Sequence, residues 1–402
     1  MIIYCDRIYM RGGIKDGFLK IEDGKLVDFF AASADLKADK DYRGYRLIPG
    51  VFDTHNHGGF GYSLMALDAV PKTSEIKAYL KGQASWGVTS ILPTTCNVAT
   101  IALLADLADE QVDGAKICGI HSEGPWGARV GEKGINTGYP PVDMELAKQM
   151  VAAGKGKLKL IDIAPEVEGA LVAIRFFVDQ GIAVGAFHTN ANYEEANRGI
   201  DAGITVATHL GNVMTGLHHR DIGTLGACLL RPEVDCEIIC DDMHISLEIV
   251  KIFFKVKDLS KFIMISDNVL YAGAPAGRYK GMTQDVNSDR ISIRVTEDGF
   301  VLSETGRLSG SSKPVMYGIK NLVEKLQMPL EQVILLSSLN PAKKYGFGAT
   351  KGELAIGKDA DLVAIDDNFD VVATFSEGRQ VFDREVDGNL FNPEYIKAYK
   401  LD

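Results

Sequence analysis

The sequence predicts an α/β protein: a (β/α)8 barrel with a small β-sandwich domain that both termini build together. Three observations support this. Apolar strand-like runs alternate with helical stretches at intervals of roughly 25 to 45 residues along the middle of the chain. Nearly every run closes on a polar or ionisable residue. Both ends of the chain carry short strands with turn signals instead.

Eight runs have the composition of strands buried on both faces, because apolar residues follow one another with little alternation. Repeated strand–loop–helix units favour a parallel sheet covered by helices. We therefore predict a metal-dependent barrel domain over residues 47–349. Its strands cover residues 47–57, 88–95, 117–123, 158–165, 182–188, 205–209, 237–241 and 262–267.

The clearest predicted helix lies between the fifth and sixth strands. Asn192 and Glu195 have the spacing of a capping box, and Gly203 favours an end to the helix. Apolar residues recur on one face of a second helix, over residues 246–257. The other predicted elements are helices over 312–326 and 329–337 and a hairpin-bearing insertion over 272–308.

The two ends of the chain are built in one style, which differs from that of the barrel. Gly12-Gly13 and Asp23-Gly24 mark turns between short strands, and residues 350–386 show the same pattern. We predict that residues 1–46 and 350–402 form one β-sandwich domain beside the barrel.

Composition limits which binding partners and which cellular compartment we expect. The net charge is −11 and no basic run occurs, which disfavours a nucleic acid partner. No apolar run approaches the roughly 18 residues that cross a bilayer, so we expect no membrane association. Asp6 and Arg7 come too early for a secretory signal, and the six cysteines form no CxxC pair. We therefore expect reduced thiols and a cytoplasmic location.

Five of the eight histidines close or follow predicted strands, as do two acids. The C-terminal ends of barrel strands meet on one face, so these side chains are expected to share one pocket. Glu123, His188 and His209 form a three-ligand set, which leaves a metal ion the open position that catalysis needs. This set is the principal predicted metal site.

The other candidates surround that site. His55 and His57 have i, i+2 spacing, which directs both side chains to one side of a strand and lets them hold a metal ion. Asp267 ends the eighth strand and is the expected proton carrier, taking a proton from water and returning it to a leaving amine. His244 can hydrogen-bond a substrate carbonyl or an anionic group. Arg220 is the best cationic candidate for a phosphate contact.

Plainer interpretations stay open for His121, His244 and Arg220. His121 faces the same way as Glu123 and is either a satisfied structural histidine or a contact to the site. His244 can equally be part of the core or surface, and Arg220 can be a solvated loop charge. His218 and its neighbour His219 receive no assignment.

Taken together, these motifs resemble the amidohydrolase superfamily and, most closely, its N-acetylglucosamine-6-phosphate deacetylase family. The resemblance covers essentially the whole chain. The His-x-His motif is shared across the superfamily, whereas Glu-Gly-Pro-Trp and Leu-Ser-Gly-Ser are fairly specific to the deacetylases. The matching stretches are 49–55, 121–126, 208–214, 242–244, 266–267, 308–311 and 357–363.

The resemblance implies a hydrolase that removes the N-acetyl group from an amino-sugar 6-phosphate. It implies one or two divalent ions per subunit, with Zn and Fe as the leading identities. Glu123, His188 and His209 would hold the principal ion. His55 and His57 would help to hold a second ion, although some relatives lack this pair and use one metal.

The resemblance also implies roles in proton transfer and recognition. Asp267 would act as general base and then as general acid, and His244 would orient the acetyl carbonyl. Asn212, the backbone at Val213, and Arg220 would contact the sugar phosphate. The family's counterpart of Arg220 comes from the neighbouring subunit, which implies a homodimer.

Three stretches depart from the family pattern. The fifth strand ends Phe-His-Thr-Asn at 187–190, where relatives have Gly-His-Ser or Gly-His-Thr. Family members carry a histidine in a Gly-Thr-His-Asn-Pro run, where this chain reads Gly-Ile-Asn-Thr at 134–137. Their Leu-Tyr-Asn-Ala-Met run is here Leu-Gly-Asn-Val-Met at 210–214. The metal and proton-carrying positions are intact, while sugar-facing positions are altered. N-acetylgalactosamine 6-phosphate therefore remains an alternative substrate to N-acetylglucosamine 6-phosphate.

Two further classes remain as alternatives. The chain can be an N-acyl amino acid or cyclic amide hydrolase, but most of these use a carboxylated lysine on the fourth strand. That strand ends here at 163–166 without a lysine. A barrel that has lost catalysis and only binds ligands is the other class, and the filled ligand positions disfavour it.

Overall fold

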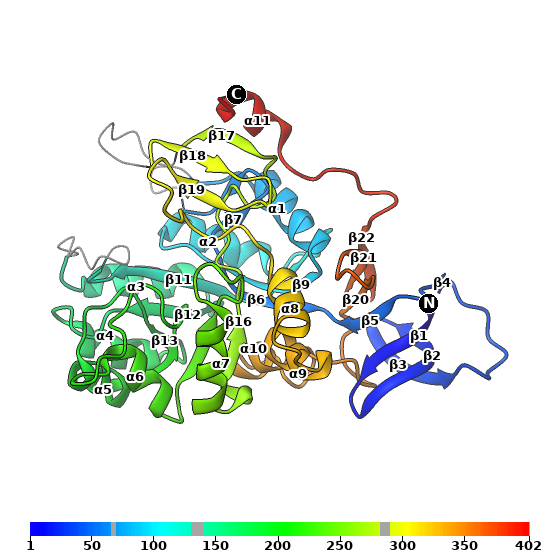
Figure 1. Cartoon of the computed structure of the whole chain (residues 1–402), viewed down its shortest axis with the longest axis horizontal. Helices are drawn as coiled ribbons and strands as arrows, with labels where there is room; N and C mark the ends of the chain where they lie inside the picture. The colour runs from blue at the N-terminus through cyan, green and yellow to red at the C-terminus, as the bar shows by residue number, and fades with distance from the viewer. Residues whose placement is uncertain (66–69, 130–139, 282–289, 402) are drawn as a thin grey trace.

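The computed structural model describes residues 1–65, 70–129, 140–281 and 290–401. Its centre is the predicted barrel of parallel strands (Figure 1). Two sheets, of order β10-β9-β6 and β11-β12-β13-β14-β15-β16, are joined by backbone bridges between Thr94 and His121 and between Asn56 and Asn268. The strands are β6 (Val51–Asn56), β9 (Val88–Pro93), β10 (Lys116–Ile117) continued by β11 (Ile120–Trp126), β12 (Leu158–Ile163), β13 (Ala183–Ala186), β14 (Ile204–Ala207), β15 (Asp235–Ile238) and β16 (Phe262–Met264).

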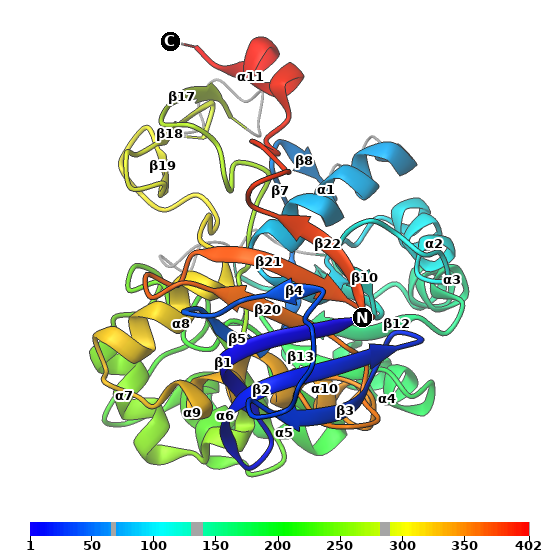
Figure 2. The same ribbon diagram turned by 90° about the vertical axis from the view of Figure 1, so that its right-hand side faces the viewer.

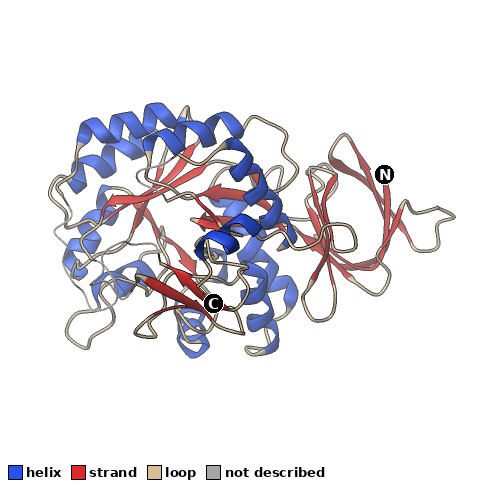
Figure 3. Cartoon of the chain, turned by 90° about the horizontal axis from the view of Figure 1, so that it is seen from above, coloured by secondary structure: helices blue, strands red, loops and turns tan. Residues whose placement is uncertain are grey.

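Helices surround these strands (Figure 3). The capping box of α5 is confirmed, because the Asn192 side chain accepts from the Glu195 backbone N–H and the Glu195 side chain accepts from the Asn192 N–H. The helices are α1 (Thr73–Ser85), α2 (Val98–Leu107), α3 (Met144–Gly154), α4 (Ala170–Asp179), α5 (Tyr193–Ala202), α6 (Gly223–Leu230), α7 (Leu247–Val256), α8 (Val315–Glu324), α9 (Leu330–Ile334) and α10 (Asn340–Lys344).

The first predicted strand is wrong in one respect, because residues 47–57 contain two strands instead of one. β5 (Arg46–Pro49) pairs with β20 (Leu362–Ile365) outside the barrel, whereas β6 pairs with β9 inside it. Gly50 lies between them, and a Cβ there would be 2.1 Å from the Thr89 Oγ1. Only glycine allows this approach, so the chain can change sheets within one residue.

The two ends of the chain build one sheet, of order β22-β21-β20-β5-β1-β2-β3, with β4 paired to β1. Figure 2 shows the blue N-terminal strands beside the orange C-terminal ones. Apolar side chains from both ends, including Ile3, Leu19, Leu362 and Phe375, form one buried cluster. The other strands of this sheet are β1 (Ile2–Met10), β2 (Gly13–Glu22), β3 (Lys25–Ala31), β4 (Lys40–Asp41), β21 (Val371–Ser376) and β22 (Arg379–Asp383).

The predicted insertion after the eighth strand is a three-stranded antiparallel sheet, β17-β18-β19. The C-terminal helix α11 lies beside it, away from the terminal sheet (Figure 1). The division into residues 1–46 with 350–402 and residues 47–349 stays a prediction. β5 belongs to the terminal sheet but extends past residue 46, and α11 lies away from that sheet. The bounds are β17 (Gly277–Lys280), β18 (Ser292–Val295), β19 (Val301–Ser303) and α11 (Pro393–Tyr399).

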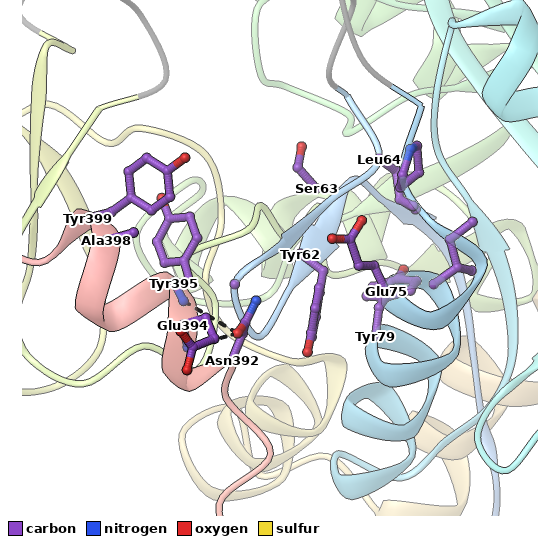
Figure 4. A pocket seen from close by; sticks show the side chains of 13 residues that line it. Tyr62, Ser63, Leu64, Glu75, Tyr79, Asn392, Glu394, Tyr395, Ala398 and Tyr399 are labelled. Carbon is purple, nitrogen blue, oxygen red and sulfur yellow. Dashed lines mark hydrogen bonds between the residues drawn. The ribbon is translucent and has the colours of Figure 1, made fainter.

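Helix α11 also contacts the β7–β8 hairpin (Gly58–Gly59 and Tyr62–Ser63), which directly follows His57. The Asn392 N–H donates to the Phe60 carbonyl at 2.9 Å. A cleft of about 380 Å³ lies between this hairpin, α1 and α11 (Figure 4). The C-terminus therefore supports the segment on which one predicted metal ligand depends.

Two further features concern the helices and the cysteines. Within the described ranges, no helix is long and apolar enough to cross a membrane. All six cysteines are free; five are buried and Cys96 is half-buried. Burial raises the pKa of the Cys118 thiol to about 11, which keeps it protonated and unreactive near neutral pH.

Candidate active site

Glu123, His188 and His209 meet at the C-terminal end of the barrel. Their potential metal-ligating atoms all lie within 4.8 Å of one another. Glu123 Oε1 is 3.0 Å from His209 Nε2 and 3.4 Å from His188 Nε2. Glu123 lies inside β11, not at its end as predicted, because β11 continues to Trp126. The three residues that the sequence groups as the principal metal site are thus close neighbours in the structure.

His55, His57 and Asp267 form a second group of the same kind. Asp267 Oδ1 is 3.2 Å from His57 Nε2 and 3.5 Å from His55 Nε2. The two imidazole Nε2 atoms are 3.1 Å apart. Glu123 joins the groups, because its Oε2 lies 3.2 Å from His57 Nε2. Asp267 was predicted only as a proton carrier, and its position also makes it a potential third ligand beside the histidine pair.

Three of these residues have left-handed backbone conformations: His188 with φ +40°, His209 with φ +33° and Asp267 with φ +51°. Non-glycine residues rarely adopt positive φ, and such strain is concentrated at functional sites. The strands before them end earlier than predicted, at Ala186, Ala207 and Met264. Each side chain is therefore aimed by the first turn of a loop and not by the strand pleat.

Burial disfavours the charged forms of these groups, raising the pKa of Glu123 and lowering that of His57, but mutual pairing outweighs burial. The charge of His57, with hydrogen bonds from His188 and His209, holds the pKa of Glu123 well below its usual range. Glu123 and Asp267 raise the pKa of His57 to about 10, and Glu123 raises the pKa of His209 to about 9.

This donor set fits a divalent metal. Four imidazoles and two carboxylates face one another in a largely buried space, and these are the nitrogen and oxygen ligands of catalytic metal sites. The raised imidazole pKa values show that the carboxylates attract positive charge, which protons or a metal ion can provide. The two groups can therefore hold a divalent ion.

Two carboxylates lie beneath the site, inside the barrel. Glu237 on β15 has one oxygen 3.2 Å from His55 Nδ1 and accepts a hydrogen bond from the Thr54 hydroxyl at 2.8 Å. Burial raises the pKa of Glu237, but the hydrogen bond and charge of His55 bring it below its usual value. Sequence reasoning gave Glu237 no role; the available signal was an acid between the apolar residues Cys236 and Ile238.

Asp162 on β12 is the second of these carboxylates and settles the contacts of His121. Asp162 Oδ2 is 2.7 Å from His121 Nε2, and His121 Nδ1 is 3.2 Å from the Thr94 hydroxyl. Both ring nitrogens are therefore engaged inside the barrel. The His121 ring packs edge-on against His55, with 4.5 Å between centroids.

Two of the residues predicted to contact the substrate, His244 and Asn212, lie on loops after barrel strands. His244 is held by Asp241, whose Oδ2 is 2.7 Å from His244 Nδ1, so Nε2 is the nitrogen that can meet a substrate. Asn212 is buried and donates from its amide to the His209 carbonyl at 3.1 Å. Val213 follows with φ +50°.

Arg220 differs from these residues, because it lies on an exposed hairpin turn. His218 and Asp221 exchange both backbone hydrogen bonds, at 3.0 and 3.1 Å, and so fix the turn. The His218 and His219 rings lie 4.1 Å apart beside it. Arg220 and His219 line an open cavity of about 570 Å³ with the start of α5. The structure therefore places Arg220 at the surface.

Glu166 is a further residue that sequence reasoning passed over. It accepts a hydrogen bond from the Thr189 hydroxyl at 2.6 Å and one from the Asn190 N–H. These bonds fix the loop that aims His188. The divergent run at residues 134–137 lies outside the described part of the chain.

Comparison with known proteins places the fold and site in a family. Residues 46–381 match the model of the Amidohydrolase family. An N-acetylglucosamine-6-phosphate deacetylase from Vibrio furnissii is 32% identical over 344 residues, covering 84% of this chain and 83% of that protein. An N-acetylgalactosamine-6-phosphate deacetylase from Escherichia coli O157:H7 is 30% identical over 377 residues, covering 92% and 95%.

Solved structures agree. N-acetyl-D-glucosamine-6-phosphate deacetylase from Mycobacterium smegmatis superposes with a TM-score of 0.82 at 26% identity, covering 95% of this chain and 100% of that one. A mutant of that enzyme, solved in complex with N-acetyl-D-glucosamine-6-phosphate, gives 0.81 at 25% identity, with 95% and 99% covered. The chain therefore belongs to the amidohydrolase family and, within it, to the N-acetylglucosamine-6-phosphate deacetylase family.

Proposed function

We propose that this protein hydrolyses the N-acetyl group of an amino-sugar 6-phosphate, with N-acetylglucosamine 6-phosphate as the substrate. Water adds to the amide, the C–N bond breaks, and acetate and glucosamine 6-phosphate leave. The observation that carries the proposal is the meeting of Glu123, His188 and His209 beside Asp267 on one face of the barrel. The names of the deacetylases to which the chain is similar support the substrate class.

In this proposal, Glu123, His188 and His209 hold the principal ion, and His55 and His57 help to hold a second. A divalent ion, Zn²⁺ or Fe²⁺, supplies Lewis-acid polarisation of the carbonyl and acidifies water when it is bound. The chain itself holds each imidazole in place at the end of the barrel. Because His55 and His57 are buried, bulk water does not compete with them for the ion. One or two ions per subunit agree with the two groups of ligands.

Asp267 carries the proton. His55 and His57 keep its pKa below the usual range despite burial, so the carboxylate is ionised and can accept a proton from water near neutral pH. The same group then returns the proton to the nitrogen, because expulsion of an unprotonated amine is slow. His244 is oriented by Asp241 so that its Nε2 can bind the acetyl carbonyl.

Recognition of the sugar phosphate is assigned to Asn212, the backbone at Val213, and Arg220. The exposed turn that carries Arg220 supports a contact with the substrate of a second subunit in a homodimer. A cytoplasmic location remains our prediction.

A direct assay tests the function. Protein loaded with Zn²⁺ or Fe²⁺ is expected to release acetate from N-acetylglucosamine 6-phosphate with a kcat/KM at least about tenfold above that for N-acetyl amino acids. N-acetylgalactosamine 6-phosphate is assayed beside it, because the Escherichia coli relative bears that name. Faster turnover of the galactosamine epimer would transfer the assignment to it, and faster turnover of N-acetyl amino acids would overturn the sugar substrate altogether.

Asp267→Asn tests the mechanism in the same assay. We expect kcat to fall by about 10²- to 10⁴-fold, because the amide cannot accept the proton. Asp179→Asn, at the exposed end of α4, is the control and should behave as the unchanged protein. Near-normal turnover by Asp267→Asn with its metal retained would show that another group carries the proton.

A further inference from the structure

Glu237 is a wholly buried acid that the proposed mechanism does not use. It lies on β15 in the barrel interior, with no exposed surface. Its Oε2 is 3.2 Å from His55 Nδ1, and its Oε1 accepts from the Thr54 hydroxyl at 2.8 Å. Burying a carboxylate costs several kcal/mol unless partners offset the loss of hydration. Both partners of Glu237 come from β6, the strand that carries His55 and leads into His57.

This contact fixes the state of His55. An ionised carboxylate only accepts hydrogen bonds, so His55 must carry its hydrogen on Nδ1. The lone pair is then on Nε2, which lies 3.1 Å from His57 Nε2 and 3.5 Å from Asp267 Oδ1. The bond therefore directs the one ligating atom of His55 into the second metal group and holds the plane of the ring.

The other three imidazoles are supported differently. His188 Nδ1 is 3.1 Å from the Arg129 carbonyl, a neutral acceptor. In the part of the chain that the structure describes, the buried Nδ1 atoms of His57 and His209 have no hydrogen-bond partner. His55 is thus, among these four described histidines, the one whose Nδ1 contacts a carboxylate. A carboxylate makes an imidazole a stronger electron donor than a carbonyl does.

We propose that Glu237 is a positioning residue that fixes and strengthens His55 as a ligand, and so determines whether the His55–His57–Asp267 group holds a metal ion. The inference rests on the proposed metal site and extends it to the strand beneath. It also gives the buried charge of Glu237 a reason, because the pair with His55 replaces the lost hydration.

The test is metal binding by the apoprotein. Glu237→Gln removes the charge and keeps the shape, because the amide oxygen can still accept from His55 and the amide nitrogen can donate to the Thr54 hydroxyl. Co²⁺ is added while its visible absorption is followed. We expect two binding steps in the unchanged protein and a 10- to 100-fold weaker affinity in one of them in Glu237→Gln. His57→Gln identifies that step, because it removes a ligand of the same group.

Asp162→Asn is the matched control. It removes another buried carboxylate, whose imidazole partner His121 has both ring nitrogens engaged by Asp162 and Thr94. We expect both Co²⁺ steps to stay within about threefold in this variant. An equal weakening in Asp162→Asn would mean that interior charge in general, and not the bond to His55, sets the affinity, and the inference would fail.

The outcomes separate the inference from the proposed function. If the unchanged apoprotein binds no metal, the proposed hydrolytic site itself is wrong. If it binds metal and Glu237→Gln binds equally tightly at both steps, only the role of Glu237 is wrong. Thermal unfolding of the apoprotein variants shows whether each is folded, and Thr54→Val offers a second way to disturb Glu237 without removing its charge.

Discussion

At the scale of single residues, the largely buried candidate metal ligands contrast with Arg220, the exposed residue that we propose to contact the phosphate. The ligating atoms of each candidate metal group lie within 4.8 Å of one another, and His188, His209 and Asp267 reach these positions through left-handed backbone conformations. Arg220 instead lies at the tip of a surface hairpin, which Asp221 anchors to α5 by accepting from the Tyr193 N–H at 3.2 Å. A fixed but exposed cation is suited to a substrate bound by another subunit.

Mixing two inactive variants tests whether Arg220 acts across subunits. Arg220→Ala is expected to lower kcat/KM for the sugar phosphate by about 10- to 100-fold, because a charge-assisted phosphate contact is lost. If Arg220 serves its partner, a heterodimer of Arg220→Ala and Asp267→Asn contains one complete site. Activity should then rise after the two are mixed and allowed to exchange subunits.

Arg198→Ala, at an exposed position on α5, is the control for removing a surface arginine and should leave kcat/KM unchanged. No recovery in a mixture proven to contain heterodimers would place Arg220 in its own subunit's site or outside recognition. Kinetics on the unphosphorylated sugar separate these cases, because loss of a phosphate contact leaves that substrate unaffected.

At the scale of elements, local signals set the helices and long-range contacts set the strands. Asn192, Glu195 and Gly203 define α5 from its own sequence. Residues 47–57 instead look like one buried run and form two strands, because β5 takes its partner from β20, about three hundred residues away. Strand ends at His188 and Asp267 were misplaced for a related reason: positive φ is set by what surrounds the loop.

The β7–β8 hairpin gives an element-scale prediction. Gly61 has φ +80°, and a Cβ there would lie 2.9 Å from the Asn392 Cβ and 3.0 Å from the Tyr395 Cβ. Gly61→Ala should push α11 away and destabilise the protein by about 1–3 kcal/mol. Urea unfolding measures the loss, and faster tryptic cleavage near Lys397 reports the release of α11.

Gly388→Ala is the matched control, because a Cβ there meets no atom within 4 Å. It should leave both the urea midpoint and the cleavage rate unchanged. A Gly61→Ala protein as stable as the original, with α11 equally protected, would show that the hairpin and the helix separate at little cost.

At the scale of the whole molecule, ion pairs connect the two ends of the chain. Arg11 Nε donates to Glu353 Oε2 at 2.8 Å, and Lys358 Nζ lies 2.7 Å from Glu353 Oε1. The hydrogen bond from Arg11 and the charge of Lys358 lower the pKa of Glu353 from 4.5 to about 2. Sequence separation hides this pairing, which forms only once β1 and the C-terminal strands share a sheet.

The lowered pKa of Glu353 predicts that the free energy of unfolding depends on pH. Its folded pKa is depressed, so its stabilisation is present above about pH 4.5 and is lost as the pH falls toward about 2. Arg11 is largely exposed, so we expect Glu353→Gln to cost only about 1 kcal/mol near neutral pH. The difference in urea midpoint between Glu353→Gln and the unchanged protein should narrow as the pH is lowered from about 5 to about 3.

Glu22→Gln provides the comparison, because Glu22 pairs with Lys20 on the same sheet where both side chains are exposed. The Glu22→Gln substitution should lower the urea midpoint of unfolding by less than Glu353→Gln does at every pH. A Glu353→Gln deficit that stays constant from about pH 5 to about pH 3 would show that packing, and not charge, holds Glu353 in place.

The alternating barrel pattern, the capped helices and the types of residue at the candidate metal site could all be predicted from the sequence. Those features are local, since periodicity, caps and ligand chemistry are written in neighbouring residues. Tertiary structure alone decided that β5 leaves the barrel and that Asp267 joins the histidine pair. It also decided that Glu237 lies beneath His55. These outcomes depend on which distant strands lie side by side, and barrel closure sets that for the whole chain at once.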